Sequence, residues 1–276
     1  MSLNEKIKIG ALAAWKAGNE ILDVYETDFD VMFKTDTSPV TQADQRADKI
    51  IRDTLQEIQI PIISEETKQV DYYNRKKWNS FWLVDPLDGT KEFIQKNGEF
   101  TVNIAYIEAN KPLYGILYVP VTKHMYIADV TQQFVYFLEV TNEMTESDFT
   151  TLEQKVQKIS KPDNSEFNTL LVSRSHLDMK TTSIITQFSQ AGIEINKVGS
   201  ALKYAKLITG ESQLYFRFSP TMEWDNAAGH ALCLASGLSM YQLPSKSNIN
   251  YNTRELYSPY FAAGTKQALD SLFELL

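Results

Sequence analysis

The sequence predicts a mixed fold in which an α+β half is followed by an α/β half. Two amphipathic helical segments open the chain, a run of candidate strands follows them, and strands alternate with helices from residue 169 onward. The chain has 276 residues, 43% of them hydrophobic, which is enough for one large domain or two closely packed lobes. We expect residues 1–150 and 165–276 to form two lobes of one functional unit.

The first half begins with two predicted helices. Apolar residues recur at helical spacing over residues 4–25 and again over about 41–58. A polar turn separates the two segments, and its last residue, Thr41, can cap the second helix, in whose first turn Asp44 falls. Candidate strands follow at 81–84, 101–108, 113–119, 124–129 and 134–140.

The second half alternates strands and helices. Before it, the polar segment 141–168 predicts a surface excursion between the lobes, with a short helix near 151–158. The expected strands are 169–173, 193–198, 213–218, 238–242 and 260–263, and the expected helices are 177–190, 200–209, 225–236 and 265–275.

Composition excludes several classes of function. The chain carries 27 Lys and Arg against 35 Asp and Glu, and a net charge of −8 argues against sequence-independent nucleic-acid binding. It could still bind a small phosphate ester through cations or a local basic pocket. The single cysteine, Cys233, cannot form an internal disulfide and suits a reducing cytoplasm. With no N-terminal signal and no apolar run of about 18 to 20 residues, we expect a soluble, cytoplasmic protein without an integral membrane segment.

Two carboxylates three residues apart mark the most informative stretch, residues 82–93. Asp85 and Asp88 stand where an apolar strand is expected to end, because Pro86 disfavours its continuation as a central strand and Gly89 relaxes the backbone. The strand end is therefore expected to deliver both acids to one place. This arrangement suits a metal ion better than a hydrophobic core.

Further acids lie at the ends of predicted elements. A lone Asp at a helix start, such as Asp225, is more often a simple cap, and Glu65 with Glu66 could be a solvated loop pair. Each of these positions, however, adjoins apolar residues of an element expected to be buried. Carboxylates that converge from several such elements repel one another and protonate unless cations balance them. Because Mg²⁺ prefers oxygen ligands and completes its shell with substrate phosphate, the pattern favours metal-assisted phosphoester hydrolysis.

Asp-Gly-Thr at residues 88–90 also invites comparison with haloacid-dehalogenase phosphatases, which carry Asp-x-Asp-Gly-Thr with a nucleophilic first Asp. Here two residues separate the acids, and the motif follows two helices instead of opening the first strand. The spacing disfavours this alternative.

Four motifs along the chain resemble the inositol monophosphatase superfamily of lithium-sensitive, Mg²⁺-dependent phosphatases. The motifs are Lys34-x-Asp36-x-Ser38-Pro39-Val40-Thr41-x-Ala43-Asp44, Ile63-Ser64-Glu65-Glu66, Asp85-Pro86-Leu87-Asp88-Gly89-Thr90 and Trp224-Asp225-x-Ala227-Ala228-Gly229-His230. The resemblance implies a layered αβαβα sandwich of the inositol monophosphatase/fructose-1,6-bisphosphatase type, and two or three Mg²⁺ ions. The implied metal ligands are Glu65, Asp85, the Leu87 carbonyl, Asp88 and Asp225. Asp44 and Thr90 match the pair that orients and deprotonates the attacking water.

Within this superfamily the chain looks most like bacterial 3'(2'),5'-bisphosphate nucleotidases of the sulfur-assimilation (CysQ) type. Residues 88–94 and 97–105 carry this likeness, with Glu92 where simple inositol phosphatases usually have Asn. The implied substrate contacts are Glu65, Leu87, Asp88, Gly89, Thr90, Ser175, His176, Ser200, Lys203, Arg217 and Asp225. The His176 ring could stack on an adenine or only hydrogen-bond locally. One departure is Asn226, where this branch often has Thr.

A bisphosphate has one phosphate to cleave and a second that must be held without metal. Ser200, at a predicted helix N-terminus, together with Lys203 and Arg217 could hold the second one, although Lys203 alone would more often be a surface charge. We therefore expect removal of the 3'-phosphate from adenosine 3',5'-bisphosphate, with the related sulfonated nucleotide as another substrate.

Two alternatives stay open. One is an inositol monophosphatase or other sugar-phosphate phosphatase, and the other is a non-catalytic cation or nucleotide sensor, against which Thr90 and Asp44 argue. The resemblance also implies lithium sensitivity and peripheral association with the inner membrane in some members. No basic amphipathic helix predicts such association here, and the oligomeric state is not predicted.

Overall fold

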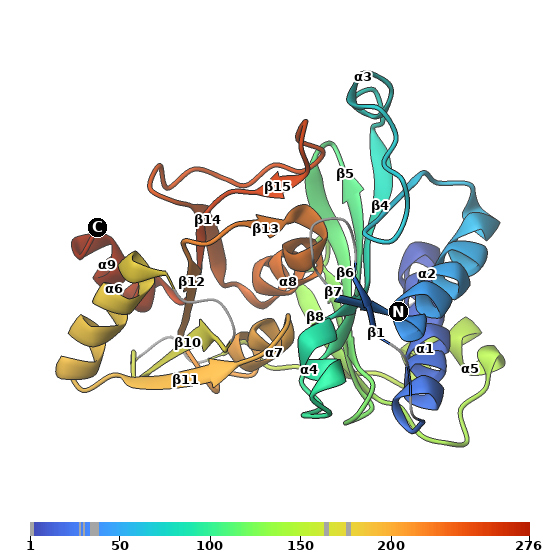
Figure 1. Ribbon diagram of the computed structural model, residues 1–276, viewed down its shortest axis with the longest axis horizontal. Coiled ribbons are helices and arrows are strands. Elements are labelled where there is room, and N and C mark those ends of the chain that lie inside the picture. The colour runs from blue at the N-terminus through green and yellow to red at the C-terminus, as the bar shows by residue number, and fades with distance from the viewer. Residues whose placement is uncertain (1–2, 28, 30, 34–38, 163–165, 175–177) are drawn as a thin grey trace.

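The computed structural model describes residues 3–27, 29, 31–33, 39–162, 166–174 and 178–276. Two large sheets, of seven and five strands among the described residues, stand beside each other, with one pair of helices between them and further helices on both outer faces (Figure 1). Across the molecule the layers run helix, sheet, helix, sheet, helix, which confirms the predicted αβαβα sandwich. Among the described residues, no helix is both long and apolar enough to cross a bilayer.

The first sheet is built almost entirely from the first half of the chain. Its strand order among the described residues is β3-β4-β5-β6-β7-β8-β9, with β3 parallel to β4 and the other neighbours antiparallel. The strands are β3 (Ile62–Ser64), β4 (Ser80–Asp88), β5 (Thr101–Glu108), β6 (Lys111–Val119), β7 (His124–Asp129), β8 (Phe134–Glu139) and β9 (Gln157–Lys158).

Two long helices, α1 (Glu5–Tyr25) and α2 (Gln42–Leu55), cover the outer face of this sheet (Figure 1). Their apolar faces pack into one core cluster with alternate residues of the sheet, such as Trp82 and Val84. Thr41 caps α2 as predicted, because its side chain accepts from the Ala43 N–H while Asp44 accepts from the Thr41 N–H.

The helices α7 (Leu202–Ile208) and α8 (Glu223–Ser236) fill the middle layer. Almost every residue of α8 is buried, and the helix lies very close to β6, because a Cβ on Gly115 would stand 2.6 Å from the Ala228 carbonyl oxygen. One core cluster joins α7 and α8 to both sheets, so the two halves of the chain share a core. The boundary of the two lobes between residues 150 and 165 stays a prediction.

The second sheet has the order β11-β10-β12-β16-β14 among the described residues, with α6 (Met179–Gln190) and α9 (Lys266–Glu274) on its outer face. Its strands are β10 (Thr169–Ser173), β11 (Glu194–Val198), β12 (Leu214–Arg217), β14 (Ser239–Gln242) and β16 (Phe261–Gly264). The α/β rhythm predicted from residue 169 onward is confirmed, as are both N-terminal helices and the five strands expected between residues 81 and 140.

The prediction that Pro86 ends its strand is wrong. β4 continues to Asp88, and its register against β5 shifts between Asp85, which faces Asn103, and Asp88, which faces Thr101. Two residues of β4 thus oppose one of β5, which is a β-bulge. Proline is tolerated in a bulge because the ladder of hydrogen bonds is already interrupted there.

The segment 141–168 also differs from expectation. Its helix, α5 (Glu146–Thr150), lies earlier than predicted, a 3-10 turn spans Leu152–Gln154, and β9 then joins the edge of the first sheet. Phe149 and Leu152 are buried, and the Phe149 ring packs 5.2 Å from that of Trp15 on α1. Such scattered apolar side chains produce no periodic signal, yet they dock the segment on the rest of the fold.

Several short elements were not predicted. They are β1 (Val31–Phe33), β2 (Pro39–Thr41), β3, α3 (Tyr72–Arg75), α4 (Thr90–Ile94), β13 (Thr221–Met222) and β15 (Tyr257–Ser258). Elements of this length carry little periodicity of their own, so their pairing partners decide whether they form.

Candidate active site

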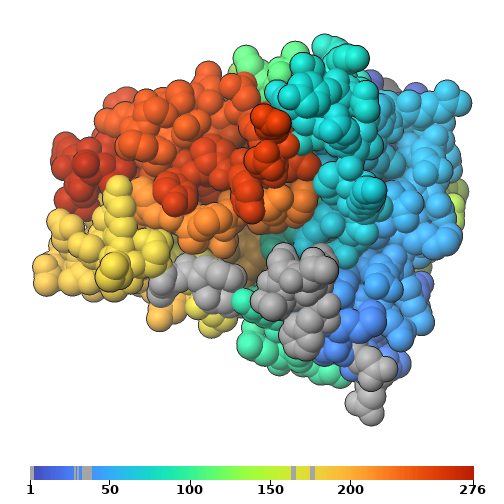
Figure 2. Space-filling model, turned by 45° about the horizontal axis from the view of Figure 1, so that its top comes forward, coloured from blue at the N-terminus to red at the C-terminus, as the bar shows by residue number. Residues whose placement is uncertain are grey.

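A cavity of about 390 Å³ lies where the C-terminal end of β4 faces α7, β12 and the start of α8. Figure 2 shows the surface hollowed where the orange and cyan parts of the chain meet. Both halves of the chain therefore contribute to its lining. The predicted site residues that line it are Glu65, Asp85, Leu87, Asp88, Gly89, Thr90, Ser200, Lys203, Arg217 and Asp225.

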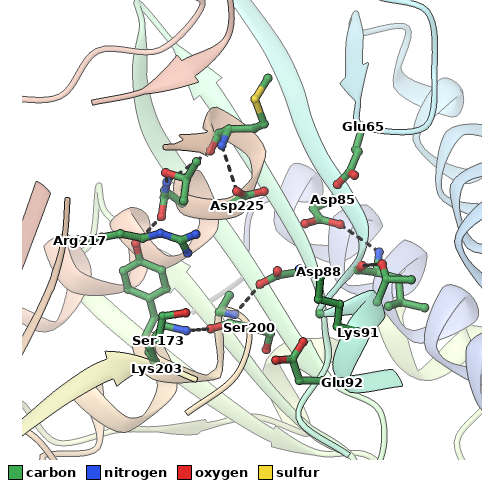
Figure 3. A pocket seen from close by; sticks show the side chains of 18 of the residues that line it. Glu65, Asp85, Asp88, Lys91, Glu92, Ser173, Ser200, Lys203, Arg217 and Asp225 are labelled. Atoms are coloured by element: carbon green, nitrogen blue, oxygen red, sulfur yellow. Dashed lines mark hydrogen bonds between the residues drawn. The ribbon is translucent and has the colours of Figure 1, made fainter. Parts of the chain in front are cut away.

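Three carboxylates form one side of the cavity, which we call the acidic side: Glu65, Asp85 and Asp225. One oxygen of each lies within 4.8 Å of the others, and Figure 3 shows the side chains turned toward one another. Because β3 and β4 are parallel, their C-terminal ends bring Glu65 and Asp85 to the same edge of the sheet. Asp225 enters from the first turn of α8, where it accepts the Met222 N–H at 3.0 Å.

Burial and mutual repulsion disfavour ionisation of these acids. Burial raises the pKa of Asp225 to about 8, and the nearby Asp88 and Glu65 add to the shift. Burial likewise raises the pKa of Asp85 well above its usual value, with contributions from Glu65 and Asp88. A bound cation would reverse this penalty by stabilising the ionised forms.

Asp88 lies between the acidic side and the opposite half of the chain. Its Oδ2 accepts the Ala201 N–H and, more distantly at 3.4 Å, the Asn103 amide. Burial raises the pKa of Asp88 to about 6, while the Lys203 ammonium acts in the other direction. Asp88 is thus the acid that both halves of the chain hold in place.

Thr90 and Asp44 form a hydrogen-bonded pair beside the cavity. Thr90 begins α4 directly after Gly89, whose φ of +93° favours glycine, and the Thr90 hydroxyl donates to Asp44 Oδ1 at 3.0 Å. Asp44 Oδ2 accepts the Thr41 N–H and hydroxyl, both at 2.7 Å. Burial raises the pKa of Asp44, although these hydrogen bonds oppose the shift. Asp44 therefore serves as a helix cap and as the partner of Thr90 at once.

Ser200, Lys203 and Arg217 form the side of the cavity that we call the cationic side (Figure 3). Lys203 is buried, its ammonium donates to the Val198 carbonyl at 3.2 Å and to that of Ser200, and burial lowers its pKa to about 8. Arg217, at the end of β12, donates from Nε to the Ser219 hydroxyl at 2.9 Å. Lys203 is therefore no surface charge.

The predicted helix begins two residues later than expected, and the Ser200 hydroxyl accepts the Leu202 N–H of its first turn at 3.3 Å. α7 begins at Leu202, and the Ala201 N–H that precedes it donates to Asp88. Ser200 occupies a turn with a left-handed φ of +44°. Residues 34–38, together with Ser175 and His176, lie outside the described residues.

Five aromatic or charged residues of the lining were absent from the predicted site residues: Lys91, Glu92, Tyr204, Tyr215 and Tyr257. Lys91 follows Thr90 within the conspicuous 82–93 stretch and could have been included. Tyr257 had no such signal, because only the pairing of β15 with β13, which sets it opposite Met222, brings it to the cavity.

Sequence comparison decides the family. The model of the inositol monophosphatase family matches residues 3–273. The chain belongs to this family. In this family member, Glu65, Asp85, Asp88 and Asp225 of the matching motifs line one cavity, and Asp44 is bonded to the lining residue Thr90.

Individual relatives show which members of the family this chain is similar to. The 3'(2'),5'-bisphosphate nucleotidase CysQ of Escherichia coli (strain K12) is 38% identical over 248 residues, which cover 88% of this family member and 93% of the relative. The crystal structure of CysQ from Bacteroides thetaiotaomicron is 37% identical, with a TM-score of 0.82 over 94% of this chain and 97% of that one. The fold is also that of an IMPase/NADP phosphatase crystallised with Mg²⁺ and phosphate, with a TM-score of 0.75 over 95% and 92% of the two chains at 16% identity.

Proposed function

We propose that this protein is a Mg²⁺-dependent 3'(2'),5'-bisphosphate nucleotidase that removes the 3'-phosphate from adenosine 3',5'-bisphosphate and releases AMP and phosphate. One observation carries the proposal: a single cavity has an acidic side suited to metal ions and a cationic side suited to an anion. A substrate with one phosphate to cleave and another to hold matches both sides. The similarity to nucleotidases named CysQ supports the same substrate class.

The acidic side fits Mg²⁺ by the nature of its donors. They are carboxylate oxygens, buried and close enough to repel one another, as the raised pKa values of Asp85 and Asp225 indicate. Glu65, Asp85, Asp88, Asp225 and the Leu87 carbonyl would hold two or three ions. Such ions, when bound, neutralise charge on the phosphoryl group and lower the pKa of water.

Thr90 and Asp44 would handle the proton of the attacking water. The Thr90 hydroxyl donates to Asp44 Oδ1, so its own lone pairs stay available to accept a proton as its hydrogen passes to the carboxylate. The raised pKa of Asp44 makes that carboxylate a better proton acceptor than an exposed Asp. Water is the nucleophile in this scheme, and no covalent enzyme intermediate forms.

Ser200, Lys203 and Arg217 would hold the phosphate that is not cleaved. Arg217 offers a planar fork of donors and Lys203 a compact charge, both beside a half-buried serine hydroxyl. Gly89 and Thr90 would contact the reacting phosphate from the turn after Asp88. Ser175 and His176 stay candidates for the nucleoside end, and cytoplasmic location and lithium sensitivity stay expectations of the same proposal.

The test is a side-by-side turnover assay with Mg²⁺ on adenosine 3',5'-bisphosphate, its sulfonated relative and inositol 1-phosphate. We expect the two nucleotides to be the better substrates, with AMP as a product of the first. Faster turnover of inositol 1-phosphate would assign the protein to the sugar-phosphate phosphatases. Nucleotide binding without any phosphate release would favour a sensor.

A further inference from the structure

Glu99, in the loop before β5, joins the two halves of the chain next to Ser200, which lines the cavity. Arg174, one residue after β10, donates from Nε to Glu99 Oε2 at 2.8 Å and from a terminal nitrogen to Oε1 at 2.7 Å. The Gly199 N–H also donates to Glu99 Oε2, at 2.8 Å. One carboxylate thus holds two separate segments of the second half.

The segment that begins at Gly199 is the turn that carries Ser200 and leads into Lys203, two of the three residues of the cationic side. The Gly199 N–H binds Glu99 and the Ala201 N–H binds Asp88, so residues of the first half hold both ends of the turn. Between them Ser200 has a φ of +44°, which for a residue with a side chain costs roughly 1 kcal/mol. A turn in such a conformation persists only where its surroundings hold it.

The lack of space around Gly199 shows that the turn lies very close to the first half of the chain. A Cβ at this position would stand 2.8 Å from Glu92 Cγ and 2.9 Å from Glu99 Oε2. Both acids belong to the stretches 88–94 and 97–105 that distinguish the nucleotidase-like sequence. One acid from each of these two stretches, Glu92 and Glu99, therefore lies against the turn.

The contact between Arg174 and Glu99 matters for its geometry more than for its contribution to stability. Side chains of Arg174 and Glu99 are 42% and 23% exposed, and an ordinary ion pair at such exposure contributes little to stability. A two-pronged Arg–carboxylate pair nevertheless fixes orientation, and a further bond to Lys197 O, at 2.9 Å, restrains the guanidinium. The pair therefore fixes the position of the turn and adds little to the stability of the fold.

We propose that Glu99 and Arg174 are positioning residues that hold Ser200 and Lys203 in the place required by the second phosphate of the substrate. They thereby set the preference for a bisphosphate over a monophosphate. This inference rests on the proposed function, because it assigns the pair to the phosphate that is not cleaved. Neither residue is among those that line the cavity.

The experiment compares kinetics on adenosine 3',5'-bisphosphate and adenosine 3'-monophosphate for the wild type, Glu99→Gln and Arg174→Lys. Glu99→Gln keeps the size of the side chain but loses the two-pronged pair, and Arg174→Lys keeps the charge but loses the fork. We expect each to raise KM for the bisphosphate by about tenfold, with kcat for both substrates and KM for the monophosphate within about twofold.

Asp270→Asn is the matched control, because it removes an exposed ion pair with Lys266 on α9 and should change no kinetic constant. A wild type that does not prefer the bisphosphate contradicts the proposed function and this inference together. A preference that survives both substitutions contradicts this inference alone. An equal loss of kcat/KM on both substrates, together with a lowered melting temperature, also contradicts this inference, because that result would mean a merely structural role.

Discussion

The acidic and cationic sides of the cavity carry opposite charges and are held in place differently. Glu65 directly follows β3, Asp85 lies within the neighbouring β4, and Asp225 lies in the first turn of a buried helix, so regular elements set their positions. Ser200 and Lys203 lie on and just after a turn that the first half of the chain holds through Glu99 and Asp88. Because different parts of the chain hold the two sides, we expect substitutions on one side to impair catalysis and substitutions on the other to impair substrate preference.

The largest expected effect is on the acidic side. Asp225→Asn should lower kcat at least about 1,000-fold, because the neutral amide removes a charge that the metal requires. The fold should persist, since an Asn oxygen can still accept the Met222 N–H that Asp225 accepts at 3.0 Å. Steady-state kinetics and circular dichroism check both statements, with Asp270→Asn as control. Near-normal turnover would remove Asp225 from the metal site.

A smaller loss should follow from Thr90→Val, which keeps the shape of the side chain but removes the hydroxyl that donates to Asp44. Loss of proton transfer should lower kcat by about 100-fold or more and leave KM nearly unchanged. Thr54→Val is the control, because Thr54 is a buried threonine that donates only within α2, to the Ile50 carbonyl. Equal activity of the two variants would exclude Thr90 from the proton path.

On the cationic side, Lys203→Met should raise KM for adenosine 3',5'-bisphosphate by about 10-fold to 100-fold and leave the monophosphate unaffected. Lys206→Met, one turn along α7, is the matched control, because Lys206 pairs with Glu211 away from the cavity. Similar losses on both substrates would assign Lys203 to the fold or to the acidic side.

The pH dependence should separate the two sides further. Because burial lowers the pKa of Lys203 to about 8, this ammonium loses its proton as the pH rises above that value. We expect kcat/KM for the bisphosphate to fall severalfold more than kcat/KM for the monophosphate between about pH 7.5 and 9. In Lys203→Met the two profiles should run parallel, and a difference that persists there would point to another group.

The smallest effect concerns stability without metal. The raised pKa of Asp225 means that the folded protein binds a proton at this carboxylate more tightly than the unfolded chain does. Proton binding at Asp225 therefore contributes to the free energy of unfolding at low pH, and that contribution is lost as the pH rises from about 4 to 8. Added Mg²⁺ should therefore raise the melting temperature more at pH 8.5 than at pH 6, by a few degrees, about 3 to 8 °C. Thermal denaturation with and without a chelator measures this, and Asp225→Asn should reduce the difference.

Sequence reasoning was most successful where long elements or dense motifs carried the signal. The periodicity of residues 4–25 and 41–58 predicted two helices that the structure contains. Sequence reasoning failed at Pro86, because a bulge depends on the partner strand. It also failed at Phe149, whose burial depends on a distant ring on α1. Tyr257 reached the cavity only through a two-residue strand pair, which no local pattern announces.

The sequence by itself determined the acids, their spacing at the ends of predicted elements and the family resemblance, because these depend on residue identity along the chain. Tertiary structure alone decided which groups face each other across 100 or more residues, such as Glu99 with Gly199 and Asp88 with Ala201. It also decided that Lys203 is buried and that Ser200 occupies a strained turn. Burial, charge pairing and backbone restraint are properties of packed neighbours, and packing of the two halves is what creates them.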